Sequence, residues 1–127
     1  MDPNSNRGLK GLLDNEIRFL ASPSEQKDAW RGATGPYFVE FLKRTGASWD
    51  AWKKHRTTSS ISDRQFQMLE KLFGMLWEFL LDEKHPTRPS EYEAILCDPR
   101  WKAVQKQAME VYSSLRQSFE TQTLYQR

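Results

Sequence analysis

The sequence has few of the residues that define disulfide-rich, fibrous or membrane proteins. It contains one cysteine, six glycines and six prolines in 127 residues. Cys97 alone can form neither an internal disulfide nor a cysteine-based zinc site, which favours a reducing compartment. The glycine and proline content excludes collagen-like and low-complexity chains. The longest apolar run, Met75 to Leu81, contains Glu78 and is too short to cross a bilayer. We therefore expect a soluble, cytoplasmic protein with no membrane contact.

An excess of charge of one sign is also absent. The chain has 19 Lys and Arg against 17 Asp and Glu, a net charge of +2, which by itself indicates no nucleic-acid or membrane partner. Residues 1–6 are polar and lack the apolar core of a signal peptide. Aromatic residues, at 13% of the chain, supply large side chains for a core. We expect one domain over residues 1–127, with residues 1–6 and 121–127 frayed.

Helix start signals recur along the chain, whereas alternation typical of β-strands is missing. Ser22, Ser62 and Ser90 each stand three residues before Glu or Gln, the spacing of a capping box. Asp98 precedes Pro99, which is typical of an N-cap followed by proline at the first helical position. Gly46 predicts the end of one helix.

These signals predict an all-α fold, a single compact and irregular bundle of five to seven helices with the helix over 63–83 at its centre. The spacing predicts helices over residues 7–21, 23–33, 36–44, 49–56, 63–83, 91–97 and 99–119. Short connections favour antiparallel neighbours.

The helix over 63–83 carries more apolar surface than one packed side needs. One stripe is Phe66, Leu69, Phe73, Leu76, Trp77 and Leu80, and the adjacent stripe is Met68, Leu72, Met75 and Phe79. Together they cover roughly 200° of the helix. Either this helix is surrounded by its own chain, or the second stripe binds another protein, including a second copy as a homodimer. The flexible methionine side chains suit an adaptable binding surface.

A basic and aromatic stretch over residues 43–56 supports an alternative, a small nucleic-acid-binding protein. Its binding residues would be Arg44, Trp52, Lys53, Lys54 and Arg56, with cations on phosphates and the indole stacked on a base. The expected helices on either side of Gly46 have a spacing similar to a helix-turn-helix. The competing interpretation places the tryptophans in the core and the charges on a solvated helix end.

The sequence contains no known catalytic motif. His55 and His85 are the two histidines, and neither belongs to a metal-binding or nucleophile motif. Cys97 is expected to be a small buried apolar residue. We expect no enzyme activity, no cofactor and no metal. The hypothesis is a non-catalytic protein–protein interaction module that uses an apolar helical surface, as in a small accessory protein such as an immunity protein, adaptor or chaperone-like binder.

Overall fold

Every element in the described part of the chain is a helix. The computed structural model describes the backbone of residues 9–55 and 61–125 and the side chains of residues 9–54 and 61–118. Residues 9–12 are α-helical and lead directly into the next element. The elements are η1 (Leu13–Ile17), α2 (Arg18–Leu20), α3 (Pro23–Trp30), α4 (Tyr37–His55), α5 (Asp63–Leu80), α6 (Pro89–Cys97) and α7 (Pro99–Tyr125). The predicted all-α fold is confirmed. Residues 1–6, expected to fray, lie outside the described residues.

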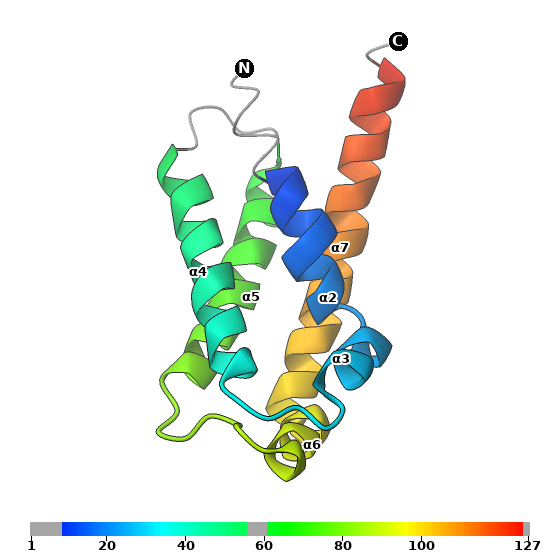
Figure 1. Ribbon diagram of the computed structural model, residues 1–127. Helices are drawn as coiled ribbons and strands as arrows, with labels where there is room; N and C mark the ends of the chain where they lie inside the picture. The colour runs from blue at the N-terminus through cyan, green and yellow to red at the C-terminus, as the bar shows by residue number, and fades with distance from the viewer. Residues whose placement is uncertain (1–8, 56–60, 126–127) are drawn as a thin grey trace.

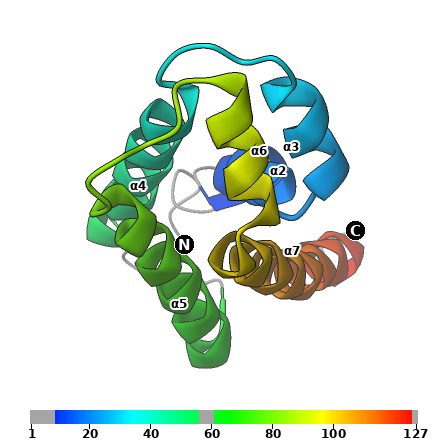
Figure 2. The same ribbon diagram turned by 90° about the horizontal axis from the view of Figure 1, so that it is seen from below.

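Long helices run along the bundle, and short helices cover one end of it. The N-terminal segment (residues 9–20), α4, α5 and α7 are the long parts (Figure 1). The short helices α3 and α6 lie at the end where α4 begins and α5 ends (Figure 1). The helix predicted over 63–83 is α5, which packs between α4 and α7 (Figure 2). Its remaining side, with Glu70, Lys71 and Glu78, is exposed.

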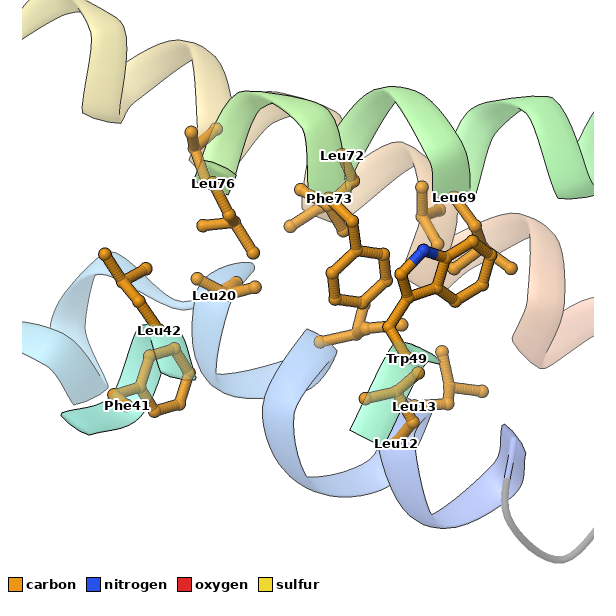
Figure 3. Packing of buried hydrophobic residues seen from close by; sticks show 14 of the residues in the cluster. Leu12, Leu13, Leu20, Phe41, Leu42, Trp49, Leu69, Leu72, Phe73 and Leu76 are labelled. Atoms are coloured by element: carbon orange, nitrogen blue, oxygen red, sulfur yellow. The ribbon is translucent and has the colours of Figure 1, made fainter. Parts of the chain in front are cut away.

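The hydrophobic core is one continuous cluster to which every described helix contributes. Its aromatic rings form two groups. At the end covered by the short helices lie Trp30, Phe38, Phe79, Tyr92 and Trp101, and between α4 and α5 lie Trp49, Trp52, Phe66 and Phe73. Trp49 and Phe73 are stacked with ring centroids 4.8 Å apart and lie beside Leu69 and Leu72 (Figure 3). Aromatic burial of this extent joins α4 to α5 along their lengths.

The helix starts follow the predicted caps with one exception. The Ser62 hydroxyl accepts from the Gln65 backbone N–H at 3.1 Å, and the Gln65 carboxamide oxygen accepts from the Ser62 N–H at 3.0 Å, which completes a capping box. Ser22 and Asp98 likewise accept backbone N–H groups at the starts of α3 and α7. The box predicted at Ser90 is wrong: α6 begins at Pro89, because proline suits the first helical position.

The predicted break at Gly46 is also wrong. α4 is a single helix from Tyr37 to His55, and Gly46 has no positive φ. A helical glycine costs about 1 kcal/mol relative to alanine. Phe38, Leu42, Trp49 and Trp52 are buried on one face of the continuous helix, and burying each such side chain contributes about 1.5–3 kcal/mol. The uninterrupted apolar face therefore outweighs the local signal of the glycine.

α7 is longer than the sequence pattern predicts. It continues past the expected end near residue 119 to Tyr125. No glycine or proline follows Pro99 in the sequence to stop the helix. Residues 126–127 lie outside the described residues.

Two buried polar side chains join helices that are distant in sequence. The Gln26 carboxamide oxygen accepts from Trp101 Nε1 at 2.8 Å and from Gln105 Nε2 at 2.7 Å. Gln26 Nε2 donates to the carbonyls of Phe19 and Leu20. Gln26 is fully buried, so this amide connects α2, α3 and α7 through the core.

Tyr92 makes a second such connection. Its hydroxyl accepts from the Phe38 N–H at 3.1 Å and donates to the Gly35 carbonyl at 2.7 Å. The first N–H groups of a helix have no partner within the helix. A side chain of α6 therefore caps the start of α4.

Candidate functional site

The four residues predicted to bind a partner do not form an exposed stripe. Leu72 and Phe79 are buried members of the core cluster. Met68 and Met75 are partly buried and pack against that cluster. The Met68 carbonyl also accepts a 3.1 Å hydrogen bond from Nε2 of Gln107 in α7. The structure thus favours the core interpretation of this stripe, which the sequence had left open beside a binding surface.

The exposed apolar surface of this region lies on a different face. Trp77 is 58% exposed and Leu81, directly after α5, is 65% exposed. The sequence pattern grouped Trp77 with Phe73 and Leu76, which are both buried. Trp77 lies at the edge of that stripe, and periodicity does not determine which edge residue a neighbouring helix covers. Its high exposure was therefore missed.

Trp77 forms one wall of a hollow between α4 and α5, named here the α4–α5 groove. The groove has a volume of about 470 Å³. It is lined by Leu42, Lys43, Gly46, Ala47, Trp49, Asp50, Lys53, Glu70, Phe73, Gly74, Leu76, Trp77 and Leu80. The two helices run antiparallel (Figure 1) and are joined through the stacked rings of Trp49 and Phe73 (Figure 3), which brings the lining residues of α4 next to those of α5.

Two glycines, Gly46 and Gly74, line the α4–α5 groove. A Cβ added at Gly46 or Gly74 would meet no atom within 4 Å, so neither glycine is required by close packing. Neither has a positive φ that would demand glycine. Each lies within a helix, where glycine costs about 0.5–1 kcal/mol relative to alanine. The two positions together leave room for another backbone to approach α4 and α5 closely.

Charges of both signs border the groove. Lys43 and Lys53 belong to α4, together with Asp50, and Glu70 belongs to α5. The Lys53 ammonium lies 5.5 Å from the Trp49 ring centroid and 4.0 Å from Asp50. An apolar centre with a mixed-charge border is typical of a protein-binding surface.

The residues of the nucleic-acid alternative do not share one surface. Trp52 is 7% exposed and stacks on Trp49 at 5.5 Å, so its ring is part of the core. Arg44 lies on the other flank of α4, with its guanidinium 5.6 Å from the Phe41 ring centroid. Lys53 borders the α4–α5 groove, and Lys54 is exposed. Arg56 lies outside the described residues. The turn needed for a helix-turn-helix is absent because α4 continues through it.

The residues considered for catalysis have ordinary structural surroundings. The His85 Nε2 atom lies 3.1 Å from the Phe79 carbonyl at the end of α5. The side chain of His55 lies outside the described residues. Cys97 is exposed at the last position of α6, so the expectation that it is buried is wrong. Within residues 9–54 and 61–118, no three His, Cys, Asp or Glu side chains gather as a metal site requires.

Comparisons with known proteins give no family for this chain. It matches no family model, no curated protein and no solved structure. No helix in the described part of the chain has the length and apolarity needed to cross a membrane.

Proposed function

We propose that the protein is a non-catalytic protein–protein interaction module and that the α4–α5 groove binds an amphipathic helix of a partner protein. The observation that carries the proposal is the exposed Trp77 in a groove that is also lined by Gly46 and Gly74, where an added Cβ would meet no atom within 4 Å. This role fits a small accessory protein such as an immunity protein, an adaptor or a chaperone-like binder. The exposed thiol of Cys97 suits a reducing compartment, so we place the interaction in the cytoplasm.

A helix suits the shape of this groove better than an extended strand does. A strand needs an unpaired sheet edge, and the described part of the chain has no sheet. Helix axes pack about 8–10 Å apart, and the separation depends on the side chains at the contact. Gly46 and Gly74 would place a third helix at the short end of this range, in the seam between α4 and α5.

Trp77 would supply most of the binding energy. Tryptophan is enriched among residues whose truncation costs about 2 kcal/mol or more at interfaces. Its ring stands beside Phe73 and Leu80, so an apolar side chain of the partner could be enclosed on several sides. Lys43 and Glu70 on opposite walls would select the orientation of a partner that carries complementary charges.

Site-specific crosslinking in the native cells tests the proposal. A photoreactive phenylalanine analogue replaces Asp50, whose exposed side chain borders the α4–α5 groove and leaves Trp77 intact, and a matched control replaces Met109 on α7, which is 53% exposed. We expect a discrete crosslinked protein from position 50 and none from position 109. Gly74→Leu should abolish the product, because the added side chain would project into the groove from a position where a Cβ meets no atom within 4 Å. Equal crosslinking from both positions, or a product insensitive to Gly74→Leu, would contradict the proposal.

The molecular mass of the protein in solution distinguishes binding of a second copy of this chain from binding of a different protein. Light scattering after size exclusion reports a monomer if the occupant is a different protein. A dimer that Gly74→Leu converts to a monomer would show that the groove binds a second copy of this chain. That result would overturn the assignment to a separate partner protein.

A further inference from the structure

A second hollow, named here the α2–α4 groove, lies on the other flank of α4. It has a volume of about 730 Å³ and is bounded by the N-terminal segment, α3 and α4. Figure 2 shows α2 between α4 and α3. None of its residues belongs to the α4–α5 groove, so binding at this second hollow is independent of the proposed function.

Aromatic rings form the floor of the α2–α4 groove. Phe19 packs against Trp30 and Phe41, with ring centroids 5.5 Å and 5.2 Å apart. Tyr37 adds a ring that is 54% exposed and approaches Gly35. The faces of aromatic rings attract cations through their quadrupole. The chain already uses this property, because the Arg44 guanidinium lies 5.6 Å from the Phe41 centroid.

Carboxylates surround the aromatic floor. The groove is lined by Glu16, Glu25, Asp28 and Glu40, against Arg18 and Arg44, which gives it a charge of −2 in a chain whose net charge is +2. Arg18 is engaged with Glu25 at 3.4 Å. Among the described residues, no ion pair neutralises the other three carboxylates. The groove therefore combines the two features that attract organic cations, negative charge and aromatic faces.

An unusual backbone turn presents one wall of this groove. η1 is a π-helical turn in which the Arg18 N–H reaches the Leu13 carbonyl, five residues earlier. The Asp14 carbonyl accepts instead from Arg18 Nε at 2.8 Å. The same turn carries Asn15 and Glu16 into the lining of the groove. π-helical turns are rare and are frequently found at functional sites.

We infer that the α2–α4 groove binds a basic peptide segment of a partner protein. Its lysine or arginine side chains would lie over Tyr37 and the Phe19–Phe41 floor, between the carboxylates of Asp28 and Glu40. A volume of about 730 Å³ exceeds what a single ammonium or guanidinium group fills, which favours a peptide over a free amine.

A titration with a defined cationic peptide tests this inference. Acetylated and amidated hexa-arginine is added to the ¹⁵N-labelled protein at low salt, and amide chemical shifts are followed by NMR. We expect shifts concentrated in the N-terminal segment, α3 and the first half of α4, and binding that weakens as salt is raised. Hexaglutamate should not bind. Shifts spread over the whole surface, or absent at low salt, would overturn the inference.

Matched variants separate the groove from general electrostatics. Asp28→Asn and Glu40→Gln should each weaken binding about twofold to fivefold, the range of exposed ion pairs. Glu110→Gln on α7, which is exposed and lines neither groove, is the charge control and should leave binding unchanged. Equal weakening by the control would show non-specific attraction and overturn the inference.

The ring of Tyr37 and the nature of the cation are tested in the same way. Tyr37→Leu should weaken binding about twofold to fivefold, whereas Tyr37→Phe, which keeps the ring, should not. Free methylguanidinium should bind far more weakly than the peptide. Equal affinity for both would assign the groove to a small cation and overturn the peptide assignment.

Discussion

The buried amide of Gln26 is expected to be a principal determinant of stability. Its carboxamide oxygen accepts hydrogen bonds from Trp101 and Gln105, and its nitrogen donates to the carbonyls of Phe19 and Leu20, at distances of 2.7–2.9 Å. These four hydrogen bonds use all the donors and acceptors of the carboxamide. The informative change is Gln26→Met. Methionine has a similar length and flexibility, so the space stays filled while every one of these hydrogen bonds is lost.

The magnitude depends on the groups that lose a partner. The Trp101 N–H, one Gln105 N–H and the Leu20 carbonyl would each lose the hydrogen bond that Gln26 makes to them. The Phe19 carbonyl keeps the Ser22 N–H as a donor. A buried polar group left unsatisfied costs about 1–3 kcal/mol, so three such groups predict a loss of about 3–5 kcal/mol after partial relaxation. That is a large part of the roughly 5–15 kcal/mol by which folded domains are typically stable.

Urea unfolding followed by circular dichroism measures this loss. The free energy of unfolding falls by about 1–3 kcal/mol per molar urea in small proteins, so the midpoint should fall by about 2 M. Gln67→Met is the matched control, since Gln67 is exposed on α5 and the same substitution there should change stability by less than about 0.5 kcal/mol.

A double-mutant cycle checks the mechanism. Gln105→Met should cost about 1 kcal/mol less in the Gln26→Met background than in the natural sequence, because its partner is already gone. A Gln26→Met loss below about 1 kcal/mol, or fully additive effects of the two substitutions, would refute the reasoning that this amide joins the helices.

Further predictions concern a cap, a helix and an ion pair. Tyr92→Phe should lower the free energy of unfolding by about 1–2 kcal/mol in urea titrations, because the start of α4 loses its cap. Gly46→Ala should raise it by about 0.5–1 kcal/mol if α4 is continuous, whereas Gly32→Ala should lower it, since Gly32 has φ +65°; destabilisation by Gly46→Ala would mean that the helix ends there. The Arg100 guanidinium holds the pKa of Asp98 below its usual value of 3.8. Because the folded state lowers this pKa, the stabilisation is present above about pH 4 and is lost as the pH falls below it. Asp98→Asn should therefore flatten the acid side of a plot of stability against pH, and an unchanged slope would contradict the assignment.

Local signals in the sequence predicted most of the helices. The caps at Ser22, Ser62 and Asp98 were found because a cap needs only residues within one turn of each other. The helix end predicted at Gly46 was wrong for the same reason. It is a local stop signal, and the buried face that overrides it, from Phe38 to Trp52, depends on helices distant in sequence.

The grooves were harder to predict than the helices. The pattern showed that α5 carries excess apolar surface. It named Leu72 as a partner-binding residue and placed Trp77 in the other stripe, but Leu72 is buried and Trp77 is exposed. Exposure at the edge of an apolar stripe depends on the position of the neighbouring helix, which periodicity does not contain. The α2–α4 groove was missed entirely, because it combines side chains from residues 15 to 44 across four helical elements, η1, α2, α3 and α4.

The sequence by itself determined the class of fold. Helical periodicity, capping residues and the scarcity of strand patterns all involve residues close together in the sequence, so they can be recognised without knowledge of any tertiary contact. Only the tertiary structure decided which apolar faces meet, that Gln26 and Tyr92 join distant helices, and where two grooves stay open. Those outcomes depend on packing between segments far apart in the chain, because burial and hydrogen bonding in a core are properties of the assembled helices together.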